Sequence, residues 1–287
     1  MQFAVSNIAW QASDRRAAYA RLERAGITGL EVAPGLLFSD SEDPFLPTER
    51  ELAAVLDEIS AYGLSLVSMQ SLLFGVSGAD LFGDAEGQIA FSRGLGRAID
   101  LAARLGLPNL VLGSPKQRIR PAGMTSEAAM EHAAAILRPL ADKAAASGIR
   151  IAMECNPVDY GTNFLTTPDE TLAFVRYAAH PAIALNFDIG ASYLTGTFAQ
   201  VNCLIEDAGD TISHVHISEP FLSLAPADPT EAGRVLCALQ DIGYKHAVSI
   251  EMRQPENGLT GLDEALRNLA VARNILEASA TGRARNC

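Results

Sequence analysis

Short apolar runs rich in Val, Ile and Leu recur along the chain, and each is followed by a polar cluster and then by a helical pattern. Eight such runs are present: FAVSNIAW (3–10), TGLEVAP (28–34), LSLVSMQ (64–70), NLVLGSP (109–115), IRIAMECNP (149–157), AIALNFDIG (182–190), ISHVHISEP (212–220) and HAVSIEMR (246–253). Strands that alternate with helices indicate a parallel sheet buried on both faces, and eight strands suffice to close it. We therefore expect an α/β protein with a (β/α)8 barrel.

The ends of the intervening helices are also marked in the sequence. Capping-box spacing, which satisfies backbone N–H groups at a helix start, occurs in TERE (48–51), TPDE (167–170) and DPTE (228–231). Several helices close on a glycine before the next strand, as in RAGITGLEV, AYGLSLV, ARLGLPNLV, ASGIRIAME and DIGYKHAVSIE. Glycine takes the left-handed conformation of a helix C-terminus at little cost. No linker interrupts the pattern, so we predict one domain over residues 1–280 and a loose tail over 281–287.

Ionisable residues directly follow the apolar residues of four successive strands. They are Glu154, Asp188, His216 and Glu251. Active sites of such barrels lie at the carboxyl ends of the strands, and a buried charge there is costly unless it is paired or bound to a cation. Any one of the four is as easily a helix cap or a salt-bridge partner. The set of three carboxylates and one imidazole, without a thiolate, favours a site for Mn²⁺, Mg²⁺, Co²⁺ or Zn²⁺.

The remaining residues near these strand ends have simpler interpretations. His214 points the same way as His216 but lies deeper in the strand, so it either supports the site or packs in the barrel with one hydrogen bond. We favour packing. Cys155 is expected to pack behind its strand as a small apolar residue.

The four residues and their surroundings in HVHISE, NFDIG and VSIEMR carry a family resemblance. The chain resembles the xylose isomerase-like TIM-barrel superfamily, and within it the sugar phosphate isomerase/epimerase group, which includes relatives of tagatose 3-epimerase, hydroxypyruvate isomerase and inosose dehydratase. The resemblance extends from SNIAW to IEMR. It implies that Glu154, Asp188, His216 and Glu251 bind one divalent metal ion, with Mn²⁺ the expected metal. It also implies that Glu154 and Glu251 are catalytic and move protons.

The chain departs from two patterns within this superfamily. Ketose epimerases carry a histidine, an acid and an arginine at the positions that here hold Ala191, Tyr160 and Leu222, which argues against a free-ketohexose 3-epimerase. Endonuclease IV has further metal ligands at earlier strand ends, where this chain has Gln70 and Gly113. DNA repair is therefore disfavoured.

The substrate pocket is predicted from residues near the strand ends. In GSPKQR (113–118), Lys116 and Arg118 are placed to hold a phosphate or carboxylate, although a surface salt bridge is the alternative for either. Arg253 is a further candidate for this role. The full set of predicted substrate-binding residues is Lys116, Arg253, Asn7, Trp10, Glu31, Gln70 and Glu219.

Composition narrows the classes of partner. The formal net charge of −12 and the lack of a basic block disfavour nucleic acid as a partner. The N-terminus lacks the features of a signal peptide and no apolar run reaches 18 residues, so we expect a cytoplasmic protein without a membrane partner. The four cysteines form no CxxC pair and are expected to be free thiols. A homodimer or homotetramer is compatible with the sequence.

Three functions remain open. The first is a metal-dependent isomerase or epimerase in carbohydrate metabolism that acts on a small sugar, sugar acid or sugar phosphate. Its two glutamates would act as acid and base through a metal-stabilised enediolate. The second is a dehydratase or lyase of the inosose dehydratase type, which shares this chemistry but eliminates water. The third is a barrel that binds a metabolite without catalysis.

Overall fold

The computed structural model describes residues 1–284 of the 287-residue chain. Its strands form a closed barrel in which every neighbouring pair is parallel and the last strand pairs with the first. The strands are β1 (Gln2–Ser6), β2 (Gly29–Val32), β3 (Ser65–Met69), β4 (Asn109–Leu112), β5 (Arg150–Glu154), β6 (Ile183–Asp188), β7 (Ile212–Ser218) and β8 (Ala247–Glu251). Seven lie within the predicted runs and β1 begins one residue before its run, and the predicted (β/α)8 barrel is confirmed as a single-domain fold.

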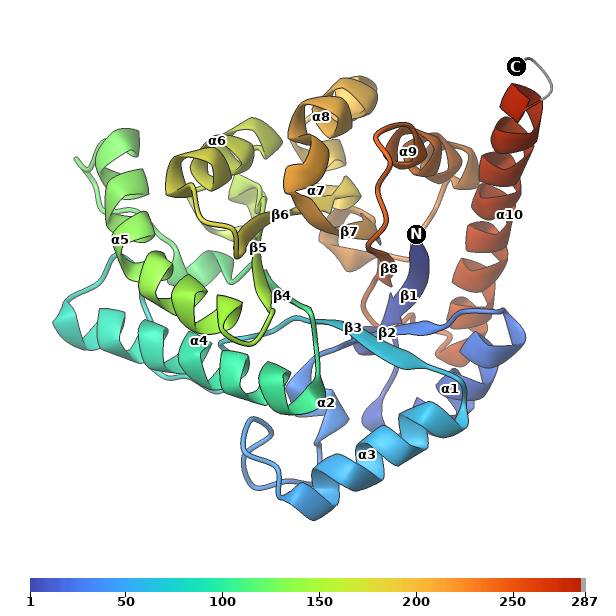
Figure 1. The fold of residues 1–287 in the computed structure, drawn as a ribbon, viewed down its shortest axis with the longest axis horizontal. Helices are drawn as coiled ribbons and strands as arrows, with labels where there is room; N and C mark the ends of the chain where they lie inside the picture. The colour runs from blue at the N-terminus through green and yellow to red at the C-terminus, as the bar shows by residue number, and fades with distance from the viewer. Residues whose placement is uncertain (285–287) are drawn as a thin grey trace.

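Helices surround the strands and separate the barrel from solvent (Figure 1). They are α1 (Arg15–Arg24), α2 (Pro34–Leu37), α3 (Glu49–Ala61), α4 (Ala85–Leu105), α5 (Ser126–Ala145), α6 (Pro168–Ala178), α7 (Ile189–Leu194), α8 (Val201–Ala208), α9 (Pro229–Asp241) and α10 (Leu259–Ala284). Their apolar faces pack on the outside of the strands and form one continuous hydrophobic core. Within the described part of the chain, no helix is long and apolar enough to cross a membrane.

The predicted helix ends are present in the structure. The Thr48 hydroxyl accepts a hydrogen bond from the Glu51 amide, and the Glu51 carboxylate accepts one from the Thr48 amide, which completes a capping box. Asp228 likewise caps α9. Gly106 ends α4 with a φ of 67°, and the other four motif glycines also have positive φ values. Helix α10 runs to Ala284, so residues 281–284 are helical rather than part of the predicted tail, and residues 285–287 lie outside the described residues.

The interior of the barrel is polar, in contrast to the apolar layer between strands and helices. At the amino-terminal end of the strands, Ser213 donates to Asn109 and Asn109 donates to Ser68. Above them lie His214 and Glu31, both buried. The four ionisable residues of the candidate site lie beyond His214 and Glu31, at the carboxyl ends of β5 to β8.

Candidate metal centre

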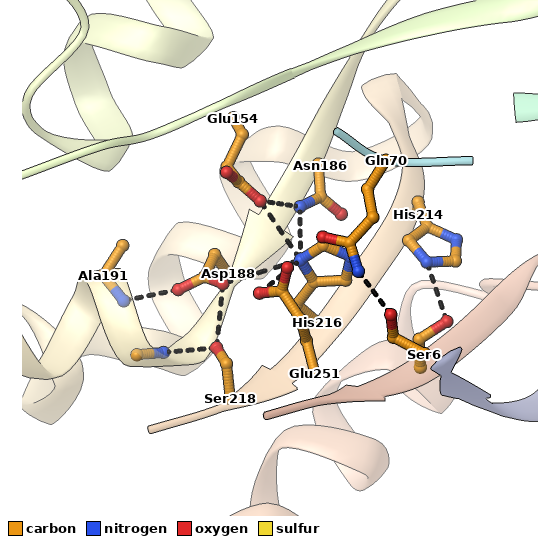
Figure 2. A network of polar contacts seen from close by, with 12 residues as sticks. Ser6, Gln70, Glu154, Asn186, Asp188, Ala191, His214, His216, Ser218 and Glu251 are labelled. Carbon is orange, nitrogen blue, oxygen red and sulfur yellow. Dashed lines mark hydrogen bonds and ion pairs between the residues drawn. The ribbon is translucent and has the colours of Figure 1, made fainter. Parts of the chain in front are cut away.

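The four ionisable residues at the strand ends converge on one point. Glu154, Asp188 and Glu251 are the last residues of β5, β6 and β8, and His216 lies on β7 between the latter two strands. Figure 2 shows the three carboxylates directed toward the imidazole of His216. One potential ligand atom from each of the four residues lies within 4.8 Å of all the others. His216 Nδ1 is 3.1 Å from Glu154 Oε1, 3.2 Å from Glu251 Oε2 and 3.6 Å from Asp188 Oδ2.

The opposite nitrogen of His216 is held by a buried carboxylate. His216 Nε2 lies 3.2 and 3.1 Å from the two carboxylate oxygens of Glu31, and both side chains are fully buried. A carboxylate can only accept a hydrogen bond, so Nε2 carries the proton and donates it to Glu31. Asn186 Nδ2 lies 3.1 Å from His216 Nδ1 and can donate to its lone pair. Glu31 thus selects the tautomer in which Nδ1 is available as a metal ligand.

These residues fit a divalent cation. A single ring nitrogen can share only one proton, yet His216 Nδ1 lies close to oxygens of three carboxylates. Three carboxylates in one buried site repel one another, and a cation of charge +2 among them would offset most of that repulsion. The donor set of three oxygens and one imidazole nitrogen is typical of Mn²⁺, Mg²⁺, Co²⁺ and Zn²⁺ sites.

Two asparagine side chains hold the Glu154 carboxylate. Asn186 donates to its Oε1 at 2.8 Å and Asn156 donates to its Oε2 at 3.0 Å. Gly113, at the end of β4, leaves room for this arrangement, because a Cβ atom there would lie 2.5 Å from Glu154 Oε2. Arg118 supports the same segment from behind by donating to the Glu154 carbonyl at 3.0 Å and to the Asn156 side chain at 2.7 Å.

Glu154 and Glu251 have opposite pKa shifts although both are buried. Burial disfavours the charged form of Glu154, but the hydrogen bond and charge of His216, with help from Asn156 and Arg118, outweigh it and lower its pKa. For Glu251, burial dominates and the neighbouring carboxylates add to it, which raises its pKa to about 7 despite the attraction of His216. The two glutamates therefore differ in proton affinity, with Glu251 able to exchange a proton near neutral pH.

Asp188 is oriented by its own helix and by β7. Its carboxylate caps the start of α7 by accepting from the Ala191 amide, and Ser218 donates to its other oxygen at 2.8 Å (Figure 2). Ser218 in turn accepts a hydrogen bond from the Gly190 amide at 2.9 Å. This network fixes the carboxylate against rotation, so that Oδ2 faces His216.

A cavity of about 560 Å³ opens above the carboxylates. Among the predicted substrate-binding residues, Lys116, Glu219 and Arg253 line it, together with Glu154, Asp188 and Glu251. Its walls also contain Tyr160 and Leu222, two positions at which the ketose epimerase pattern differs. The volume is in the range of small-molecule sites and suits a ligand the size of a sugar.

Several other predicted residues do not line this cavity. Asn7 is buried and exchanges hydrogen bonds with the backbone of Ala33, and Trp10 packs edge-on against Tyr19 in the core. Glu31 lies beneath His216 rather than at the cavity wall. Gln70 donates to Ser6 and lines a separate space of about 230 Å³ on the Gly113 side of Glu154.

Two residues near the site differ from their sequence interpretations. Arg118 is neither an anion ligand nor a surface residue, because its side chain is fully buried and faces the Glu154 segment. Its burial lowers the pKa of the guanidinium to about 10. Cys155 is buried as expected, but it lines the cavity.

The residues that orient the site are largely absent from the sequence prediction. They are Asn156, Asn186 and Ser218, with Glu31 in a supporting role. One signal was available, because Asn186 and Ser218 each lie two residues from a predicted ligand, and side chains two apart on a strand share a face. The contact between Glu31 and His216 joins residues 185 positions apart and has no local signal.

We expect the Glu31→Gln substitution to weaken metal binding by about 10- to 100-fold, as is common when the partner of a ligating histidine is changed. Glutamine keeps the volume but removes the charge that holds the Nε2 proton of His216. Titration calorimetry with Mn²⁺ measures the change. Glu219→Gln is a matched control, since Glu219 lines the cavity but accepts its hydrogen bond from the Ala227 amide, 2.8 Å away. Equal losses in both variants would contradict a specific role for Glu31.

Comparison with known proteins identifies both a sequence family and structural neighbours. A family model described as "Xylose isomerase-like TIM barrel" matches residues 19–272. No curated protein matches the sequence.

Three solved structures illustrate the structural similarity. A D-psicose 3-epimerase from Clostridium cellulolyticum is 18% identical, with a TM-score of 0.76 over 96% of this chain and 99% of that one. A 3-keto-D-glucoside 4-epimerase from E. coli is 16% identical, with a TM-score of 0.74 over the same shares of the two chains. A D-allulose 3-epimerase from a Methylomonas species is 22% identical, with a TM-score of 0.72 over 97% of this chain and 96% of that one. At these identities the similarity establishes the fold.

Proposed function

The chain belongs to the xylose isomerase-like TIM barrel family, and from this premise we propose that it is a divalent-metal-dependent isomerase or epimerase of a small sugar, sugar acid or sugar phosphate. The observation that carries the proposal is the convergence of Glu154, Asp188, His216 and Glu251 beneath a sugar-sized cavity. Structural neighbours that are themselves sugar epimerases support it. Mn²⁺ is the metal we expect.

The four converging residues would hold the cation. When bound, it would supply a Lewis acid that stabilises negative charge on the oxygens of the substrate as a proton leaves the adjacent carbon. A carboxylate alone is too weak a base for a carbon acid of this kind, so the site needs this help.

Glu154 and Glu251 would move the proton. They project from β5 and β8, which are three strands apart in the ring, and both line the cavity. Glu154 is held charged by Asn156, Asn186 and His216, and is therefore ready to accept a proton. The pKa of Glu251 in the metal-free site is raised to about 7 by burial and by the neighbouring carboxylates, so its environment favours the protonated form more than that of Glu154 does.

The cavity wall favours a substrate with an anionic group. Lys116 and Arg253 provide positive charge at the rim, and the Arg253 guanidinium is oriented by donating to the Phe221 carbonyl at 2.6 Å. Tyr160 is oriented at the same wall, where its hydroxyl accepts from the Phe221 amide at 3.0 Å. The rim therefore offers two cations near a tyrosine, which suits a sugar acid or a sugar phosphate better than a neutral hexose.

Incubation of the Mn²⁺-loaded protein with ketoses, sugar acids and their phosphates in deuterated water tests the proposal. We expect deuterium at the carbon beside the carbonyl and a product that is otherwise equal in mass to its substrate. Loss of one water molecule from the product would instead establish the dehydratase alternative. Binding without deuterium incorporation or product formation across the panel would support the non-catalytic barrel and reject the proposal.

We expect Lys116→Ala to raise KM for anionic substrates by about 10-fold while leaving KM for neutral sugars nearly unchanged. The reason is that an exposed lysine at the cavity rim contributes mainly charge attraction, and a 10-fold change corresponds to about 1.4 kcal/mol. Lys143→Ala is the control, because Lys143 pairs with Asp100 on the outer helices. Equal effects on neutral and anionic substrates would assign Lys116 a structural role.

A further inference from the structure

A second polar cavity lies at the opposite end of the barrel from the candidate metal centre. It has a volume of about 310 Å³ and is lined by residues at or near the starts of six strands: Gln2 of β1, Leu66 of β3, Asn109 of β4, Arg150 of β5, His214 of β7 and Ala247 of β8. Its lining contains none of Glu154, Asp188, His216 and Glu251. Because catalytic residues of this fold lie at the carboxyl ends of strands, the proposed reaction does not account for this cavity.

The charged side chains that line this lower cavity are all basic. Arg150 and Lys245 line it together with His246, and the lining contains no aspartate or glutamate. Among the described residues, neither Arg150 nor Lys245 lies within ion-pair distance of a carboxylate, and the hydrogen-bond partner of the Arg150 guanidinium is His246 Nε2 at 3.2 Å. Burial, followed by the charge of Arg150, lowers the pKa of His246. In a chain of net charge −12, Arg150 and Lys245 are thus two cations in a lining without an acid, which indicates a local positive potential.

His214, which lines the lower cavity, has a ring nitrogen without a hydrogen-bond partner. His214 is fully buried, and its Nε2 lies 2.9 Å from the Ser249 hydroxyl. Its Nδ1 is buried with no hydrogen-bond partner. Figure 2 shows His214 beside His216 and away from Asp188, and the two imidazole centroids are 5.2 Å apart. A buried polar atom that lacks a partner is unfavourable, so a ligand that reaches His214 would gain this hydrogen bond.

We propose that this lower cavity binds a small oxyanion, with Arg150 and Lys245 providing the charge and His214 a hydrogen bond. The planar guanidinium of Arg150 matches two oxygens of a phosphate or carboxylate, whereas Lys245 acts as a mobile point charge. The volume limits the ligand to a small metabolite. The inference is independent of the function proposed for the metal centre, since the two cavities share no lining residue.

Titration calorimetry with inorganic phosphate, on chelator-treated protein at low ionic strength, tests this site. We expect saturable binding whose affinity is at least ~10-fold weaker in Arg150→Gln/Lys245→Gln, because two charge-assisted contacts are removed. Arg24→Gln is a control for surface charge at the same end of the barrel, since Arg24 is exposed at the end of α1. Lys116→Gln is a control for binding at the upper cavity. We expect both controls to retain the wild-type affinity.

A crystal of the wild-type protein soaked in phosphate locates the ion, and we expect density next to Arg150. A parallel titration with malonate distinguishes a phosphate ester from a carboxylate as the kind of ligand that the cavity binds. Tighter binding of phosphate would assign the site to phosphate esters, and tighter binding of malonate would assign it to carboxylates. Phosphate affinity unchanged in the double variant, or density absent from the lower cavity, would overturn the proposal. Thermal melts of each variant verify that altered binding does not reflect unfolding.

Discussion

Replacement of Glu251 by glutamine is expected to reduce turnover by at least ~10²-fold, even when the protein is fully loaded with metal. Glutamine keeps the shape of the side chain and one oxygen donor at the end of β8, but it cannot accept or return a proton. Without a bound cation the pKa of Glu251 is raised to about 7 whereas that of Glu154 is lowered, so Glu251 holds a proton more readily than Glu154 does. Metal content measured beside kcat separates loss of the base from loss of the ion.

Deuterium exchange separates the roles of the two glutamates in this variant. If Glu154 serves one face of the substrate and Glu251 the other, Glu251→Gln should still exchange a proton from one epimer without completing the conversion.

The variant should also lose part of the pH dependence of metal affinity that the wild type shows. Protonation of Glu251 removes one donor, so wild-type metal affinity should fall as the pH drops below about 7, more steeply than in the variant. Normal turnover in metal-loaded Glu251→Gln would refute the mechanism with two carboxylates.

Removal of the metal by a chelator is expected to abolish activity and to lower the melting temperature. At a metal concentration of about 100 times Kd, binding stabilises the folded state by about 2.7 kcal/mol, which corresponds to roughly 4–5 °C for a chain of this size. Differential scanning calorimetry before and after chelation measures this shift. Re-addition of Mn²⁺ is the control, since it should restore both activity and melting temperature.

The chelated protein should also lose stability as the pH rises from 5 to 8. The folded-state pKa of Glu251 is about 7, above the ordinary value of 4.5, so the folded protein binds this proton more tightly than the unfolded chain does. The pKa of His216 is also raised, because the Glu251 and Glu31 carboxylates outweigh its burial. Both groups therefore stabilise the fold at low pH and lose that contribution as the pH rises.

For the chelation experiment, activity that persists after confirmed metal removal would exclude the metal centre.

The sequence by itself determined the barrel and the position of the main ionisable groups at the carboxyl ends of its strands. Buried parallel strands produce continuous apolar runs, and caps such as Thr48 with Glu51 act over three residues, so both features can be read locally. The convergence of Glu154, Asp188 and Glu251 was predictable for a similar reason. The carboxyl ends of all parallel strands meet at one mouth of a barrel, so residues that end strands become neighbours.

Only the tertiary structure decided which side chains support those groups. The β2–β3 pairing shifts register between Leu30 and Glu31, and the β6–β7 pairing shifts between Leu185 and Asn186. The pairing skips Val67 of β3 and Ser213 of β7, and such shifts change which residues stand side by side across the sheet without a local signal in the sequence. Glu31 reaches His216 from β2 across the barrel, and Asn186 reaches it from the neighbouring strand β6. The burial of Arg118 and the lower cavity around Arg150 likewise depend on contacts between distant strands and loops, for which adjacent residues carry no signal.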